Sequence, residues 1–314
     1  MVRFCHLSDI HLPSMPEPAP GELRGKRRTG WANWQRKRRH ESSQDLLDAL
    51  VERARQEMPD HWAVTGDLVN IALEAEMQNA AKWLDALAPP ENVSLVCGNH
   101  DAYVSGSLAR AAKLWGPWLN AQSTPFNKAP DNWKAFDDLY PMVQRVGDVA
   151  IISVNTGKPT APFRATGAAS IAQLARLKKL LTKLGEDGLF RLVLLHHPPF
   201  PKATHRHKRM IGAGHFRKII SDAGAELILH GHTHLDTIEH IRGSMGQVPC
   251  LCVPAAAFVP GHKRPPAAFN RLNIDREGTA WKTELARIGV ARDAAPNAPY
   301  QFQTLHTQHF VSGG

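Results

Sequence analysis

Five short motifs in this chain carry side chains that could hold a pair of metal ions. They are Asp9-Ile10-His11, Gly66-Asp67, Gly98-Asn99-His100-Asp101, His196-His197-Pro198 and Gly231-His232-Thr233-His234, and each follows an apolar run. Carboxylates, imidazoles and amide oxygens are the ligands that Mn, Fe, Co and Zn accept. Two such ions side by side lower the pKa of a trapped water and clamp the oxygens of a phosphoryl displacement. The motifs therefore indicate two-metal hydrolytic chemistry.

The apolar runs alternate with helical patterns, which predicts a mainly parallel sheet with helices on its faces. In such sheets ligands bind beyond the carboxyl ends of the strands, where the five motifs lie. The predicted strands are Val2–Leu7, Trp62–Thr65, Val93–Cys97, Val149–Val154, Leu189–Leu195 and Leu227–His230. The predicted helices follow a cap at Ser42 or Ser43, span Leu73–Leu87, begin at Ser170, and span Ala213–Ala223 before Gly224.

The spacing within the motifs predicts convergence. Asp9 and His11 are two residues apart, so in extended backbone both side chains point to the same side, and His232 and His234 repeat this spacing. So many carboxylates and imidazoles at one edge would repel without a cation. A single histidine after a strand is weak evidence, and four are left out of the site: His6, His61, His230 and His240.

Beyond His234 the pattern changes to short runs separated by turns. Ile238–Ile241, Val248–Val253, Phe269–Ile274 and Ala280–Leu285 predict an antiparallel meander, expected to form a second sheet packed on the first. We expect one domain over residues 1–290, with a basic insertion at about 12–41. Residues 291–314 are expected to form an extended C-terminal tail.

Together the five motifs resemble those of the calcineurin-like metallophosphoesterases over roughly residues 2–260. That family includes purple acid phosphatases, cyclic-nucleotide and glycerophosphodiester phosphodiesterases, and double-strand-break repair nucleases. The resemblance implies an α/β fold: a four-layer α/β/β/α sandwich with two packed mixed sheets.

The resemblance also implies a role for each residue. One ion would be held by Asp9, His11, Asp67 and His234, and the other by Asp67 (bridging), Asn99, His196 and His232. His100 would bond the substrate phosphate or protonate the leaving oxygen, with Asp101 orienting its imidazole. His196 and His197 both fit the fourth motif. His196 is preferred because it is nearer the strand end, which leaves His197 to face the phosphate.

The formal charge of +9 is concentrated in the insertion, since residues 12–40 hold eight Lys or Arg against two Glu. Trp31 and Trp34 would share a helix face with these cations. Three interpretations stay open: contact with an anionic membrane through residues 22–40, a cap docked on the body, and, less favoured, nucleic-acid binding. A second basic stretch follows His196, where Lys202 and Arg206 are candidate substrate contacts. His262, Lys263 and Arg264 could add to the same rim.

Composition points to a cytoplasmic protein, with peripheral association at the inner membrane face as an option. No apolar run approaches the roughly 18 residues of a membrane span, and the first strand-like run begins at Val2, which leaves no room for a secretory signal. The four cysteines form no disulfide framework, and the alternation at Cys250 and Cys252 fits a strand.

The expected activity is hydrolysis of a phosphodiester or diphosphate by a metal-bound hydroxide, with Mn, Fe or Zn as cofactor. The alternatives are a lipid-linked nucleotide-sugar diphosphate, a cyclic nucleotide and, third, a nucleic-acid substrate. A protein-binding scaffold of the same fold is disfavoured because no ligand is missing. The oligomeric state is left open.

Overall fold

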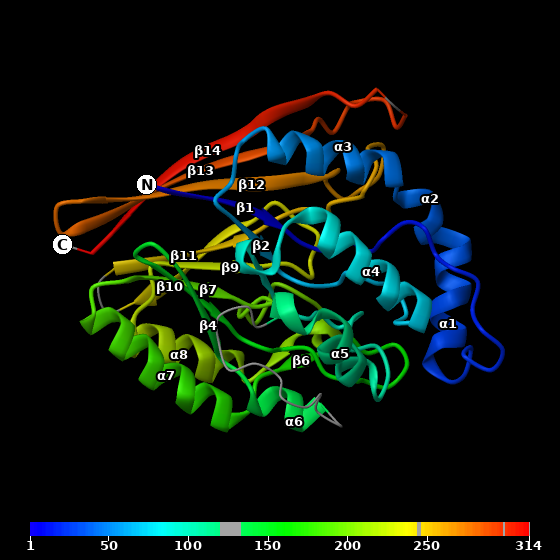
Figure 1. The fold of residues 1–314 in the computed structure, drawn as a ribbon, viewed down its shortest axis with the longest axis horizontal. Coiled ribbons are helices and arrows are strands. Elements are labelled where there is room, and N and C mark those ends of the chain that lie inside the picture. The colour runs from blue at the N-terminus through cyan, green and yellow to red at the C-terminus, as the bar shows by residue number, and fades with distance from the viewer. Residues whose placement is uncertain (120–132, 244–245, 298, 314) are drawn as a thin grey trace.

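Two six-stranded mixed sheets pack face to face in the computed structural model of this chain, which describes residues 1–119, 133–243, 246–297 and 299–313. Helices cover the outer face of each sheet, so the molecule has four layers, α/β/β/α (Figure 1). The predicted fold class is confirmed. The two chain termini lie at one end of the molecule, and the first two helices, α1 and α2, lie at the other.

The first sheet has the strand order β14-β13-β12-β1-β2-β3. β1, β2 and β3 are parallel, whereas β12, β13 and β14 extend the sheet in antiparallel register from the other side of β1. The strands are β1 Val2–Leu7, β2 His61–Val64, β3 Val93–Leu95, β12 Ala268–Glu277, β13 Ala280–Val290 and β14 Phe302–Ser312.

The second sheet has the order β10-β11-β9-β7-β5-β4, and its four central strands are parallel. A separate parallel pair, β6 with β8, lies beside it. The strands are β4 Met142–Val146, β5 Val149–Ser153, β6 Gly167–Ala168, β7 Phe190–Leu194, β8 Met210–Ile211, β9 Leu227–His230, β10 Ile238–Gly243 and β11 Gly246–Cys252.

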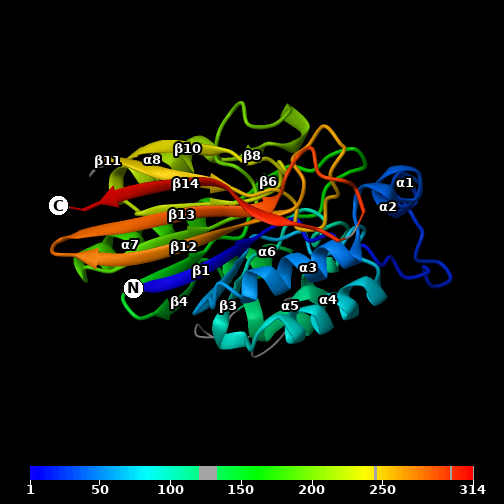
Figure 2. The ribbon, with the colours of Figure 1, turned by 90° about the horizontal axis from the view of Figure 1, so that it is seen from above.

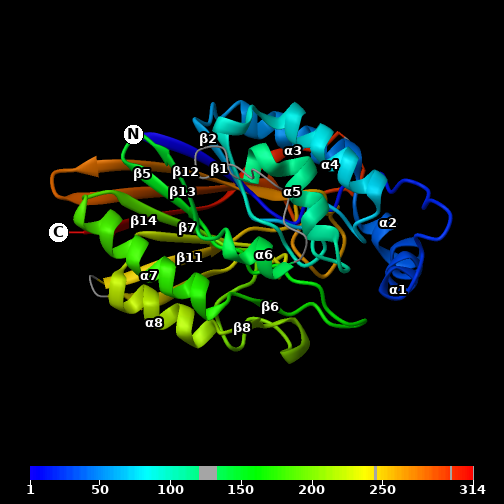
Figure 3. The ribbon, with the colours of Figure 1, turned by 60° about the horizontal axis from the view of Figure 1, so that its bottom comes forward.

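Helices α3, α4 and α5 pack on the first sheet, and α7 and α8 pack on the second (Figures 2 and 3). As predicted, α3 and α7 are capped by serine: Ser43 accepts from the Leu46 N–H, and Ser170 from the Gln173 N–H. The helices are α1 Lys26–Asn33, α2 Arg39–Glu41, α3 Gln44–Arg55, α4 Glu74–Leu87, α5 Ser107–Leu119, α6 Trp133–Asp138, α7 Ile171–Glu186 and α8 Ala213–Ala223. The other helical segments are a π-helix, η1 Trp34–Arg38, and two short 3-10 helices, η2 Pro90–Asn92 and η3 Arg206–Lys208.

Successive side chains along a strand pack in different layers of the molecule. On β7 the side chains of Phe190, Leu192 and Leu194 lie in the core between the sheets, whereas Val193 and the following Leu195 pack under α7 and α8. Both faces of β7 are therefore buried, which explains why its sequence is almost continuously apolar.

Two expectations about the last third of the chain were wrong. The four late runs do not form a sheet of their own: β10 and β11 join the sheet of β5, β7 and β9, whereas β12 and β13 join that of β1. Residues 302–312 are not a free tail, because they form β14 and pair with β13 along most of its length. Edge pairing satisfies backbone groups of β13 that would otherwise face solvent.

No helix in the described ranges has the length and apolar character needed to cross a bilayer.

Candidate metal centre

The metal-binding candidates lie past the carboxyl ends of parallel strands in both sheets. Asp9 and His11 follow β1, Asp67 follows β2, and Asn99 follows β3 in the first sheet. The remaining three follow β7 and β9 in the second sheet: His196, His232 and His234. All seven are at most 9% exposed, so water has little access to their donor atoms.

The donor atoms form four overlapping groups, within each of which all atoms lie within 4.8 Å of one another. The groups are Asp9 with His11 and His234; Asp9 with Asp67 and His196; His11 with Asp67 and His100; and His196 with His197 and His232. Motifs that are far apart in the sequence therefore converge in the folded chain, as predicted.

Asp67 occupies the middle of this arrangement. Its Oδ2 lies 3.3 Å from His196 Nε2 and 3.7 Å from His11 Nε2, which approach from opposite sheets. Its Oδ1 accepts a bond from the His100 backbone N–H at 2.7 Å. A Cβ on Gly98 would collide with this carboxylate, so the glycine makes room for it. Asp67 is thus placed where a bridging ligand would be.

Several donor atoms point into the centre without a partner. His11 Nε2, His196 Nε2 and Asn99 Oδ1 are buried and make no hydrogen bond within the described part of the chain. The opposite ring nitrogens are fixed, since His11 Nδ1 donates to the Val69 carbonyl at 3.0 Å and His196 Nδ1 to the Thr65 carbonyl at 2.6 Å. Buried polar atoms left unbonded are costly, and an imidazole held through its far nitrogen is typical of a metal ligand. These atoms fit a pair of cations.

Five of the seven ligand candidates have a left-handed backbone, with φ between 40° and 70°: Asp9, His11, Asp67, His232 and His234. The expectation that Asp9 and His11 converge through extended backbone was therefore wrong. Sharp turns aim these side chains instead, at an energetic cost that is concentrated at functional sites.

The buried carboxylates and imidazoles of the centre have shifted pKa values. Burial alone would raise the pKa of Asp67, but His196 and His100 hold it well below its usual range. Burial opposes protonation of His196, yet the Asp67 carboxylate raises the pKa of that imidazole to about 9. Burial lowers the pKa of His11 and of His232 to about 3, so both are neutral, the form that binds metals.

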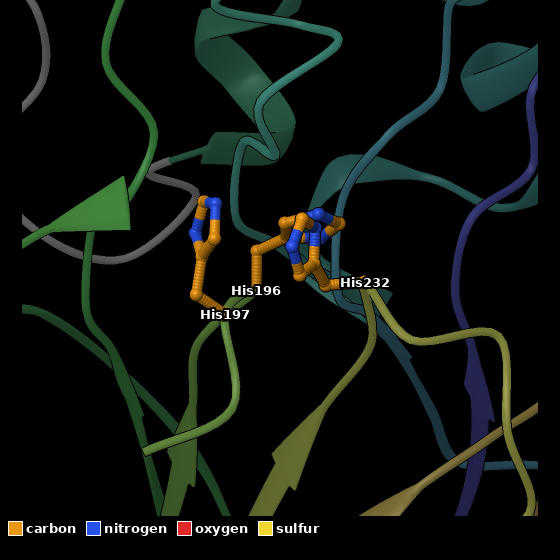
Figure 4. Close-up of side chains that lie close together, drawn as sticks. All are labelled: His196, His197 and His232. Carbon is orange, nitrogen blue, oxygen red and sulfur yellow. The ribbon is translucent and has the colours of Figure 1, made fainter. Parts of the chain in front are cut away.

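His196 and His197 occupy different positions despite being neighbours. Figure 4 shows the rings of His196, His197 and His232 close together, and the His232 ring centroid lies 4.5 Å from that of His197 and 5.2 Å from that of His196. His197 Nδ1 lies 2.9 Å from Thr156 Oγ1, while His196 Nε2 faces Asp67. This geometry supports His196 as the ligand in the fourth motif. His197 is fully buried, as His196 is, and its Nε2 makes no hydrogen bond within the described part of the chain.

The sequence led us to expect that Asp101 orients the His100 imidazole, but Asp101 has other partners. Its carboxylate accepts bonds from the backbone N–H groups of Gly98 and Asp67 at 2.8 Å, and also from Leu68 and Val69. Buried Glu76 accepts the next N–H groups along the same loop, at Asn70, Ile71 and Leu73. The two carboxylates hold the loop that carries Asp67. The His100 ring is positioned instead by the Asn70 carbonyl, next to its Nδ1.

Two arginines contact histidines of the centre, and one of them, Arg264, was expected at its rim. Lys202 and Arg206 are exposed. From the same stretch, the backbone carbonyl of Lys208 lies 2.9 Å from His232 Nε2. Arg38 of the insertion, which we had not placed at the site, lies with Nη2 2.9 Å from His100 Nε2. Arg264 lies with Nη1 3.2 Å from His234 Nδ1.

The insertion is docked on the body through its α1 face. Lys26 Nζ donates to Thr160 Oγ1 at 2.8 Å, Arg27 donates to the Ile71 carbonyl at 3.1 Å, and Trp31 packs on the core. A Cβ on Gly30 would collide with Tyr103 and Ile71. Five of its cations stay exposed: Arg24, Arg28, Arg36, Lys37 and Arg39.

Known proteins resemble this chain in sequence or in fold. The chain is 24% identical over 240 residues to a probable cyclic nucleotide phosphodiesterase of Synechococcus sp., covering 76% of this chain and 80% of that one. A dimetal phosphatase from Danio rerio superposes with a TM-score of 0.59 at 15% identity, covering 97% and 99% of the two chains. A purple acid phosphatase from yellow lupin gives 0.54 at 10% identity, covering 98% of this chain and 53% of that one.

The family model of the calcineurin-like phosphoesterases matches residues 2–236, which contain all five motifs. The chain belongs to the calcineurin-like phosphoesterase family and is a phosphoric ester hydrolase.

Proposed function

We propose that this protein hydrolyses a phosphodiester or a diphosphate with two metal ions bound between the strand ends. The main support for this proposal is the position of Asp67, whose Oδ2 lies between one imidazole from each sheet. Asp9, His11 and His234 would hold one ion with Asp67, and Asn99, His196 and His232 the other. The mixed oxygen and nitrogen donors suit Mn, Fe or Zn.

When bound, such ions lower the pKa of a water and neutralise charge on the phosphoryl oxygens. The side chains contribute positioning and a dry site. The Val69 and Thr65 carbonyls fix the His11 and His196 rings, so neither ring has to reorient. His100 projects from the loop beside Asp67 and is the candidate to bond a phosphate oxygen or protonate the leaving oxygen.

The cyanobacterial relative supports a cyclic nucleotide as one candidate substrate, because its printed name assigns it that activity. A lipid-linked nucleotide-sugar diphosphate is the second candidate and is argued from the basic insertion. A nucleic-acid substrate is the third.

The test uses metal-loaded protein and two ligand variants, Asp67→Ala and Asn99→Ala. Each should lower turnover of an aryl phosphodiester by roughly 1,000-fold, at the upper end of the loss for a single stabilising group. Elemental analysis of the wild type should find about two ions per chain. Asp85→Ala is the matched control, because this carboxylate is exposed on α4 and does not lie in any of the donor groups of the centre. Full turnover in either ligand variant would refute the assignment.

A further inference from the structure

Two arginines from distant parts of the chain line one pocket on the Asp9 side of the centre. The pocket is lined by Asp9, His11, Arg38, Glu41, His234 and Arg264, with an apolar wall from Ala255, Ala257 and Phe258. Arg38 comes from the insertion and Arg264 from the loop between β11 and β12. Each guanidinium lies against a histidine of the site, as described above.

The two segments that carry these arginines are tied together. Ser42 and Phe258 form an antiparallel bridge. Ser43 N–H donates to the Ala257 carbonyl at 3.0 Å, and Val259 N–H to the Glu41 carbonyl at 2.9 Å. Ser42 Oγ also donates to the Arg38 carbonyl at 3.1 Å. These bonds hold the backbones of the two segments together, which reduces the entropy that ordering them around an anion would cost.

The pocket has more positive charge than a singly charged phosphodiester requires. The Arg38 and Arg264 guanidiniums are the cations on its wall. Glu41 is the acidic group on the pocket wall outside the centre, and its carboxylate lies 3.6 Å from Lys37 Nζ. The positive charge of two bound divalent ions would exceed the negative charge of the Asp9 and Asp67 carboxylates. An additional anionic group on the substrate would match this excess.

Arg264 is the second cation of the pocket. Its Nη1 lies 3.2 Å from His234 Nδ1, and His234 Nε2 lies 3.1 Å from Asp9 Oδ1. A guanidinium has five N–H donors, and a phosphate is a preferred acceptor for those that this contact does not use.

Resting on the proposed function, we propose that Arg38 and Arg264 form a clamp for the non-scissile phosphate of a diphosphate substrate. The clamp selects diphosphates over simple diesters, since only a diphosphate places a second anionic phosphorus next to the one being attacked. Arg38 and Arg264 are specificity-determining residues in this proposal, and the five motifs do not include them.

The test compares kcat/KM of metal-loaded wild type, Arg38→Gln, Arg264→Gln and the double variant. Three substrates are used: UDP-glucose as the diphosphate, bis(p-nitrophenyl) phosphate as the diester and p-nitrophenyl phosphate as the monoester. In the double variant the value for the diphosphate should fall by about 100-fold or more, and those for the other two by less than about 10-fold. Arg36→Gln, an exposed arginine of the same turn, is the control and should match wild type.

A second readout does not depend on turnover. Calorimetry of inorganic pyrophosphate binding to the loaded proteins should give a Kd at least about 10-fold weaker in each single variant. Equal losses on all three substrates, a monoester loss as large as the diphosphate loss, or unchanged pyrophosphate binding would each overturn the clamp. If wild type hydrolyses none of the three substrates, the proposed function fails instead, and pyrophosphate binding still tests the clamp.

Discussion

Asp67 and Asp101 are both buried carboxylates at the same loop, yet their partners give them different roles. Asp67 turns one oxygen towards the imidazoles, and its pKa stays well below the usual range because those rings outweigh burial. Asp101 accepts backbone N–H groups, and burial together with the Asp67 charge raises its pKa to about 7. The first side chain faces the metal centre, and the second fixes the backbone that carries it.

This difference predicts distinct losses for Asp101→Asn and His100→Gln. Asp101→Asn replaces an acceptor oxygen with an amide donor facing backbone N–H groups, at about 1–3 kcal/mol for each bond lost. We expect a lower melting temperature and fewer than two bound ions. His100→Gln should keep the wild-type melting temperature and metal content while losing turnover. Thermal melting, elemental analysis and an aryl diester assay separate the two cases. A stable, fully loaded Asp101→Asn protein would contradict the positioning role.

At the scale of elements, the insertion has two faces. One face packs on the body through Lys26, Arg27 and Trp31, which fits the interpretation of a docked cap. It also delivers Arg38 to the centre. The other face of the insertion presents its exposed cations. These cations are the basis of the separate proposal that the insertion contacts an anionic membrane.

The membrane proposal predicts that the exposed cations, not the docked ones, set vesicle binding. Replacing Arg24, Arg28 and Arg36 with Gln should remove most sedimentation with phosphatidylglycerol vesicles at low salt, at about 1 kcal/mol per cation. The variant should keep wild-type turnover of a soluble aryl diester, because these side chains do not line the pocket. A triple change of exposed residues far from the insertion, Lys178, Lys179 and Lys183 to Gln, is the control. Unchanged sedimentation of the insertion variant would rule out this contact.

At the scale of the whole molecule, three apolar cores hold the four layers together, one between the sheets and one under each helical layer. Histidines are buried in these layers away from the centre. His61 at the start of β2 is 0% exposed, and its Nε2 lies 2.9 Å from Ser94 Oγ. Burial lowers its pKa to about 3.

His61 should therefore make the fold sensitive to acid. Its pKa is about 3 in the folded protein and near 6.5 when unfolded, so between these values the unfolded chain binds the extra proton. The free energy of unfolding should fall as the pH drops through this window, by up to about 1.4 kcal/mol per pH unit from this group. His61→Gln should show a shallower slope in denaturant titrations from pH 7 to 4, whereas His240→Gln, at an exposed position on β10, should keep it. Identical slopes in wild type and His61→Gln would contradict this account.

The sequence by itself determined the local structure and the ligand types. The apolar runs predicted β1 and β9 to the residue. A serine cap was predicted for α7 at Ser170 and for α3 at Ser42 or Ser43, of which Ser43 is the cap. Local periodicity and capping depend on neighbouring residues, which one sequence displays directly. The five motifs specified donor atoms because their chemistry is a property of residue type.

Only the tertiary structure decided which strands pair and which cations reach the centre. Alternation of strands and helices leaves pairing open, so neither the division into two sheets nor the pairing of β14 could be read from the pattern. Arg38 looked like one cation of a basic run, and its place beside His100 depends on how α1 docks and on the bridge from Ser42 to Phe258. Contacts between residues far apart in the chain arise from packing, which no local pattern encodes.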